Sequence, residues 1–369
     1  MAVVAKQEQA RGFRPSPGLI GGAVFLLLVA AGVTVGVKSG VCEKSFSIWV
    51  QFAINGLTVG SLYAMIALGY TLVYGVLQLL NFAHSEVFMI GTFAGLYAIR
   101  SLFGITDANH PNGLSGVFLL VVLLAAILLA GLASGGVAML MERVAYRPLR
   151  KAGASRLNYL ITAIGVSLFL SNLFLLLDGQ SHLGIPKWPN IAGRGPVFYP
   201  TIMPQKNVFT IFHTAINNLE VLVVVVAVVM LVMLDLFVHR TRAGKGIRAV
   251  AEDPETASLM GVNINAIIVL TFFVGGVMAG GAGLLYGLFF GQAQFNIGFV
   301  PGIKAFTAAV LGGIGNIRGA MLGGILLGLI ENLGSACTGL QWEPVIAFGV
   351  LVGVLMFRPT GLLGERVGG

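Results

Sequence analysis

The chain has 369 residues, of which 57% are hydrophobic and 10% are charged, and its mean hydropathy is +0.92. Soluble domains carry about 25% charged residues, so this composition excludes a water-soluble globular protein. The net charge of +8 does not indicate nucleic-acid binding, because the basic residues lie at the ends of apolar runs, as membrane topology requires. Long unbroken apolar runs and abundant glycine predict an all-α, polytopic bundle rather than a β-barrel.

In chain order, the apolar runs predict a bundle of about 8–10 transmembrane helices, since about twenty residues cross a bilayer. Ten candidate spans lie at 18–37, 47–74, 86–103, 115–141, 159–177, 217–238, 264–290, 303–316, 319–336 and 343–357. The first could be a cleaved signal sequence, but the sequence favours a retained anchor, because no small-residue cleavage site follows it.

The distribution of positive residues predicts the orientation of these spans. Basic clusters occur at the N-terminus, in "ERVAYRPLRKAGASR", in the loop 239–263 and at the C-terminus. If all of these are cytoplasmic, the spans alternate without conflict, and both the N- and C-termini are cytoplasmic. The long segment 178–216 is then external.

The loop "HRTRAGKGIRAVAEDPETASLMGVN" is too patterned for a simple connection. Pro254 suits the first turn of a helix, and Asp253 can cap it. Gly261 supplies a stop. The pattern predicts a short helix over 254–260 with an apolar patch of Leu259 and Met260. It could rest at the lipid headgroups or dock on a partner.

The same loop resembles the cytoplasmic coupling loop of the branched-chain amino acid (Liv-type) permease family of ABC importers. "ETASLMG" is similar to the Glu-Ala-Ala-x-x-x-Gly signature of importer permeases, although the Ile-x-Leu-Pro element of that signature is missing downstream. The resemblance implies that this loop fits a groove on an ATPase subunit. It assigns ATPase coupling to a set of nine residues: Arg248, Glu252, Asp253, Pro254, Glu255, Ala257, Leu259, Met260 and Gly261.

Two further stretches resemble this family, "INGLTVGSLYAMIALGYTLVYGVLQLLNFAHSEVFMIG" and "FVPGIKAFTAAVLGGIGNIRGAMLGGILLGLIENLG". The resemblance covers roughly 46–360, which we expect to form the permease transmembrane domain. Residues 1–45 are expected to be an N-terminal extension with an extra transmembrane segment.

Polar residues beside the apolar spans are candidates for the transport pathway or its gate, because charge at membrane depth is usually functional. Asn81, His84 and Glu86 lie in "NFAHSE", near a predicted break in helical structure. The alternative is that Asn81 or Ser85 caps the next span, with Glu86 beside the positive end of that helix.

Glu331 is a further pathway candidate, inside a predicted span. It could pair with Lys304 or Arg318, or be protonated, and we favour a polar tie between helices over direct solute contact. Lys304 is expected near the outer end of its span, with its amine reaching the headgroups.

The chain contains no Gly-Lys-Ser/Thr phosphate loop, so no ATP-binding cofactor site is expected in it. The five histidines form no catalytic or metal-binding pattern, and we expect neither enzymatic activity nor a metal. Cys42 and Cys337 could form a bond, but two unpaired thiols are favoured.

The resemblance implies a permease subunit of a bacterial inner-membrane ABC importer for branched-chain or other neutral amino acids. The expected partners are a second homologous permease, two ATPase subunits, an external solute-binding protein and the lipid bilayer. The alternatives are an ion-gradient-driven secondary transporter, with Glu331 or Glu86 as proton carrier, and an ABC permease for urea or short amides. A channel-like facilitator is a third alternative.

Overall fold

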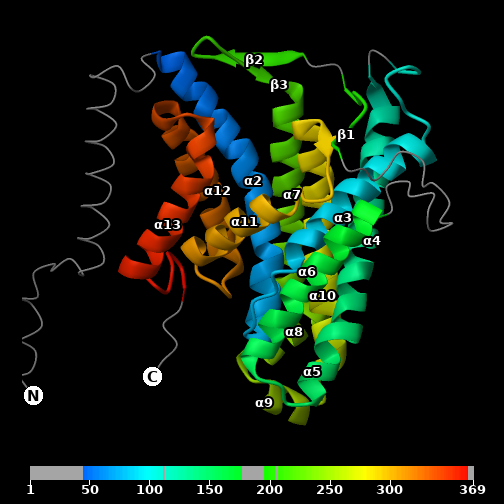
Figure 1. Ribbon diagram of the computed structural model, residues 1–369, viewed down its shortest axis with the longest axis vertical. Coiled ribbons are helices and arrows are strands. Elements are labelled where there is room, and N and C mark those ends of the chain that lie inside the picture. Colours follow the sequence, from blue (N-terminus) through cyan, green and yellow to red (C-terminus); the bar gives the residue numbers. More distant parts are fainter. Residues whose placement is uncertain (1–44, 111–112, 177–194, 204–205, 365–369) are drawn as a thin grey trace, which may run out of the picture.

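The computed structural model describes residues 45–110, 113–176, 195–203 and 206–364, and these form a bundle of helices (Figure 1). Within those ranges, seven helices are long and apolar enough to cross a membrane, counting the short turns that extend two of them. They are α2 (Phe46–Leu77), α4 (Gly116–Met141), α6 (Arg156–Leu176), α7 (Asn218–Arg240), α10 (Ile264–Phe290), α12 (Ile317–Thr338) and α13 (Glu343–Phe357). The predicted polytopic helical fold is confirmed, whereas the expected span 18–37 lies outside the described residues.

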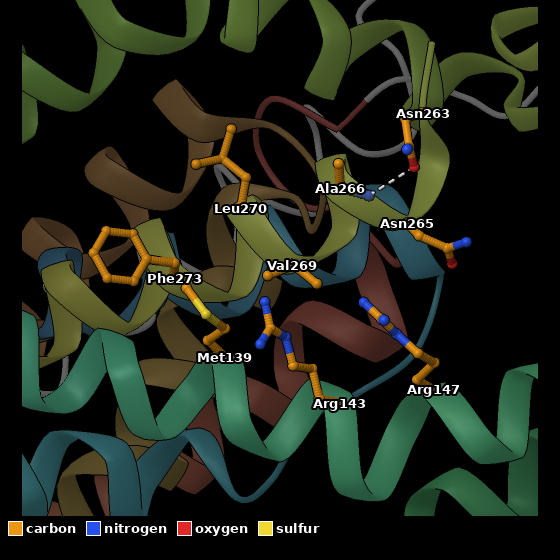
Figure 2. A pocket seen from close by; sticks show the side chains of 9 residues that line it. All are labelled: Met139, Arg143, Arg147, Asn263, Asn265, Ala266, Val269, Leu270 and Phe273. Carbon is orange, nitrogen blue, oxygen red and sulfur yellow. Dashed lines mark hydrogen bonds between the residues drawn. The ribbon is translucent and has the colours of Figure 1, made fainter.

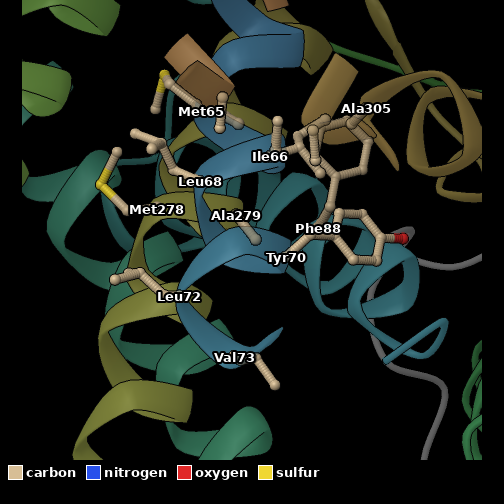
Figure 3. Close-up of a cluster of buried hydrophobic side chains, with 14 of the residues drawn as sticks. Met65, Ile66, Leu68, Tyr70, Leu72, Val73, Phe88, Met278, Ala279 and Ala305 are labelled. Atoms are coloured by element: carbon tan, nitrogen blue, oxygen red, sulfur yellow. The ribbon is translucent and has the colours of Figure 1, made fainter. Parts of the chain in front are cut away.

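Helix α2 forms the centre of the bundle and is buried along most of its length. Its neighbours in the core are α10, α12 and the two shorter helices α3 (His84–Tyr97) and α11 (Phe299–Gly312). Figure 3 shows side chains of α2 packed with those of α3, α10 and α11: Met65, Ile66, Leu68, Tyr70, Leu72, Val73, Phe88, Met278, Ala279 and Ala305. Any movement of α2 would therefore disturb several interfaces at once, because close-packed cores transmit strain.

The contact between α2 and α12 depends on glycine. A Cβ atom on Gly328 would lie 2.3 Å from the Cα atom of Gly60, and one on Gly324 would lie 2.4 Å from the Cα atom of Ala64. Small residues let helices approach closely in membranes, where van der Waals packing rather than hydrophobic burial drives association. Gly324 and Gly328 therefore allow α12 to pack directly against the backbone of α2.

We expect Gly328→Val to destabilise the protein by at least about 2 kcal/mol, because overpacking a rigid interface forces the backbones apart. Thermal unfolding of the purified protein measures the effect. Gly349→Val in α13 is the matched control, since a Cβ atom there meets nothing within 4 Å. Equal melting temperatures for the two variants would contradict a close α2–α12 contact.

Two of the expected spans are not among these seven helices. Helix α11 has 14 residues, which is about 21 Å and less than the roughly 30 Å hydrocarbon core. Helix α3 begins beside Gly69, where a Cβ atom would lie 2.0 Å from His84 Nε2. Gly69 is eight residues before the end of α2, so the imidazole of His84, the first residue of α3, lies about 12 Å inside that end. The prediction of 303–316 as an ordinary span therefore requires correction. The predicted segment 86–103 is helical over α3 and the π-helical turn Ala98–Leu102 that continues it, although this helix is not among the seven spanning candidates.

The two ends of the bundle differ. At one end lies an antiparallel hairpin, β2 (Asn207–Ile211) with β3 (Thr214–Asn217), and nearby β1 (Val197–Phe198) pairs with β4 (Gln292–Ala293). At the other end lie α5 (Arg147–Lys151), α8 (Arg242–Glu252) and α9 (Pro254–Leu259) (Figure 1). The described part of the predicted external segment and the predicted cytoplasmic loop thus lie at opposite ends.

Cys337 is disulfide-bonded, so the expectation of two unpaired thiols is wrong for this residue. Cys42 lies outside the described residues.

Candidate functional site

The loop 239–263 folds into two helices that meet at Asp253. Helix α8 begins after Thr241, whose hydroxyl accepts a hydrogen bond from Gly244 N at 3.0 Å. Helix α9 follows directly, and α10 begins after Asn263, whose side chain accepts from Ala266 N at 3.1 Å. Each helix therefore has a side-chain cap for its free N–H groups.

The expected short helix over 254–260 is confirmed as α9, and Asp253 caps it as predicted. The Asp253 carboxylate accepts from Glu255 N at 2.9 Å and from Thr256 N at 3.3 Å. The hydroxyl of Thr256 also donates to it. The hydroxyl, followed by the N–H of Thr256, lowers the pKa of Asp253, so this cap is retained at neutral pH and is lost as the pH falls through the lowered pKa.

The tip of the loop presents apolar side chains to solvent. Leu259 is 88% exposed and Met260 is 80% exposed, whereas Ala257 on the same helix is only 5% exposed. Gly261 has φ +84°, a left-handed conformation that ends the helix and favours glycine. The other predicted coupling residues are all exposed: Arg248, Glu252, Asp253, Pro254 and Glu255.

Helix α8 was not predicted, although it holds the tip in place. Its buried residues Gly244, Ile247 and Val250 recur at every third position, and its basic residues lie on the opposite, exposed face. A Cβ atom on Gly244 would lie 2.3 Å from the carbonyl oxygen of Phe237 in α7, and one on Gly246 would lie 2.7 Å from Ile267 in α10. The spacing of Ile247 and Val250 was the available signal, because apolar residues three or four apart mark one helical face.

Asn81, His84 and Glu86 are brought together where α2 breaks and α3 begins. All three are buried, with exposures of 3%, 2% and 1%. The break itself is confirmed, since Gln78 ends α2 in the left-handed conformation, with φ 54°. Non-helical backbone at this depth is tolerated because it is enclosed by protein.

The capping alternative is wrong for Asn81 and Ser85, whereas Glu86 does lie in the first turn of α3, beside the positive end of that helix, as the alternative expects. The N-cap position of α3 is Ala83, without a side-chain hydrogen bond. Asn81 Oδ1 instead accepts from the hydroxyl of Tyr146 at 2.7 Å, and Ser85 Oγ donates to the carbonyl of Phe82 at 2.8 Å. Glu86 Oε1 accepts from Ser167 Oγ in α6 at 3.1 Å. Neither Tyr146 nor Ser167 could be found from the sequence, because both contacts join distant segments.

This polar group remains incompletely satisfied. Asn81 Nδ2, His84 Nε2 and Glu86 Oε2 have no hydrogen-bond partner among the described residues. An unsatisfied buried polar atom costs about 1–3 kcal/mol, and more if charged. Such a cluster needs a functional or structural explanation.

The start of α11 also lies at this break. A Cβ atom on Gly298 would lie 2.2 Å from the carbonyl oxygen of Ser85, and one on Gly302 would lie 2.4 Å from Ser85 Cβ. The N-termini of two short helices therefore meet inside the bundle. Half-helices that end at membrane depth are a feature of solute sites in transporters.

Glu331 lies in a second buried cluster, formed by α2, α11, α12 and α13. Lys304 Nζ donates to Glu331 Oε1 and lies 3.7 Å from Glu343 Oε2. The hydroxyl of Tyr63 donates to Glu331 Oε1 at 3.4 Å. Lys304 is only 7% exposed, so the prediction that its amine reaches the headgroups is wrong. Arg318 pairs instead with Asp235 at 3.3 Å.

Comparison with known proteins identifies the family to which this helical bundle belongs. The model of the family described as "Branched-chain amino acid transport system / permease component" matches residues 52–357. The chain is 44% identical to the high-affinity branched-chain amino acid transport system permease protein BraD of Pseudomonas aeruginosa, covering 86% of this chain and 96% of the relative. It is 40% identical to LivH of Escherichia coli K12, a permease of the same description, covering 88% and 98%.

A more distant relative is the probable branched-chain amino acid transport permease protein LivH of Methanocaldococcus jannaschii, 26% identical over 84% of this chain and 91% of the relative. No solved structure matches. The helical bundle is thus that of a multi-pass membrane transport protein, and the chain belongs to the family of branched-chain amino acid transport system permease components.

Proposed function

We propose that this chain is the permease subunit of an ATP-binding cassette importer in a bacterial plasma membrane. It carries branched-chain or other neutral amino acids, and separate ATPase subunits drive it by docking on α9. The observation that carries the proposal is the pair Leu259 and Met260, 88% and 80% exposed at the tip of the bundle. Exposed apolar anchors of this kind mark protein interaction sites.

The α8–α9 unit is suited to transmit force from an ATPase. Helix α8 packs against α7 and α10 through Gly244 and Gly246, and it also contacts α2. Asn81, His84 and Glu86 lie where the chain leaves α2. A displacement of α9 would therefore be transmitted through α8 and α2 to this polar group. The unsatisfied atoms at the break would gain partners as the pathway opens to water or to a zwitterionic solute.

The remaining partners follow from the two ends of the bundle. A second homologous permease would complete the pathway. A solute-binding protein would dock at the end that carries the β2–β3 hairpin, opposite α9 (Figure 1). The chain itself would bind no ATP and no other cofactor. Urea or a short amide is the alternative solute class within the same mechanism.

A secondary transporter is the competing function, and it is favoured by the carboxylate of Glu86, which is 1% exposed and has one oxygen without a partner. Glu331 suits the role of proton carrier less well, because Lys304 occupies one of its oxygens.

The test is uptake of radiolabelled leucine into vesicles that contain the chain together with the products of its neighbouring genes. We expect an ATPase to co-purify, and uptake to require ATP and to persist with a protonophore. Uptake that needs no ATP and stops with the protonophore would assign the gradient-driven class. Competition by isoleucine, valine and urea then identifies the solute class.

A further inference from the structure

A groove separates α4 from α10 at the end of the bundle that carries α9. Further inside the bundle these two helices touch, since a Cβ atom on Gly276 would lie 2.8 Å from the Cα atom of Gly135. Beyond that crossing they leave a groove of about 400 Å³ (Figure 2). It is separate from the buried polar residues described above.

The groove is apolar along its walls and basic at its edge. Met139, Val269 and Leu270 are among its apolar lining residues. Arg143 and Arg147 extend from the side of α4 toward α10, as Figure 2 shows. The guanidinium groups of these two arginines thus lie at one edge of a groove lined by apolar side chains.

The positive charge at this edge is only partly neutralised. The buried carboxylate of Glu142 pairs with Arg147 at 3.2 Å and with Arg150 at 3.1 Å. Arg143 is exposed and forms no ion pair with any residue that the structure describes. Two guanidinium groups therefore share the Glu142 carboxylate, and the positive charge of Arg143 adds to the excess that is available to an anion.

The surroundings of the groove indicate that its occupant comes from the membrane. Leu140 is 59% exposed and Val144 is 68% exposed on the same stretch of chain. Exposed aliphatic residues on a transmembrane helix face lipid. An occupant must therefore place a long apolar part between the helices and an anion beside Arg143, which describes an anionic phospholipid.

We propose that this groove binds an anionic phospholipid from the leaflet at the α9 end, with its phosphate on Arg143 and Arg147 and an acyl chain along Met139 and Val269. Basic pockets between transmembrane helices recognise anionic headgroups through charge. Asn263, which caps α10 immediately after α9, also lines the groove. The bound lipid would thus brace the segment that joins α9 to the bundle. The site does not depend on which solute is carried.

The experiment is native mass spectrometry of the delipidated full-length chain, titrated with phosphatidylglycerol or with phosphatidylcholine of identical acyl chains. We expect phosphatidylglycerol to bind roughly tenfold more tightly, because two arginines attract its net charge. Arg143→Gln/Arg147→Gln should remove this preference. Val269→Trp, which fills the groove and keeps both arginines, should weaken the binding of both lipids.

Arg156→Gln is the matched control, because Arg156 is exposed on the same basic stretch and does not line the groove. Equal affinity of the wild-type chain for the two lipids would overturn the proposal, and this comparison needs no variant to fold. A preference that survives in the double arginine variant, or binding unaffected by Val269→Trp, would place the lipid elsewhere. Loss of the bound lipid when the second permease is added would make the groove a protein interface.

Discussion

Replacing Leu259 and Met260 together by aspartate is expected to abolish ATP-driven uptake while leaving the bundle folded. Both side chains are almost fully exposed, at 88% and 80%, so the substitutions remove no internal packing. At an interface, burying two unpaired carboxylates in place of apolar anchors costs at least about 2 kcal/mol per position. ATPase binding should therefore fall more than tenfold, measured by pull-down of the ATPase and by uptake in reconstituted vesicles.

Phe212→Asp is the control for this double variant. Phe212 is 64% exposed on the β2–β3 hairpin, which lies at the opposite end of the bundle from α9 (Figure 1). It should leave ATPase binding unchanged, although docking of a solute-binding protein could suffer. If the Leu259→Asp/Met260→Asp protein melts like the wild type and still binds the ATPase normally, α9 is not the docking element.

Much of this fold was predictable because membrane spans leave a strong signal in sequence. A helix that crosses lipid must satisfy its own backbone and needs a continuous apolar run, which is why α4, α7 and α10 match their predicted ranges closely. The helix at α9 was predictable for a local reason, since Asp253, Pro254 and Gly261 act within their own turn.

The features that escaped prediction depend on contacts between distant segments. Helix α8 was missed although the spacing of Ile247 and Val250 marks its buried face, and the close approaches of Gly244 to Phe237 and of Gly246 to Ile267 are visible only in the structure. The stretches that form α3 and α11 look apolar enough to span, and only the contacts of Gly298 and Gly302 with Ser85 show that the two helices begin beside each other. Lys304 was an expected possible partner of Glu331, and that pairing is confirmed, but the burial of Lys304 at 7% exposure was not foreseen.

The second large effect is expected at that buried pair. Lys304→Met leaves Glu331, whose side chain is 0% exposed, without a nearby cation. Breaking a buried ion pair by removing one partner costs about 3–5 kcal/mol, whereas replacing both partners is often neutral. The single variant should therefore melt far below the wild type. Lys304→Met/Glu331→Gln should recover most of the stability, because the glutamine can still accept the hydrogen bond from Tyr63.

Uptake by the double variant then distinguishes a structural role of Glu331 from a direct role in transport. If the ion pair only holds α11 and α12 together, the stable double variant transports at close to the wild-type rate, which is the result we expect. If it contacts the solute or carries a proton, the double variant is stable but inactive. Arg318→Gln is the matched control, because it breaks an ion pair whose arginine side chain is 69% exposed, and such surface pairs contribute about 0–1 kcal/mol. Equal stability of Lys304→Met and Arg318→Gln would show that the buried pair does not hold these helices together.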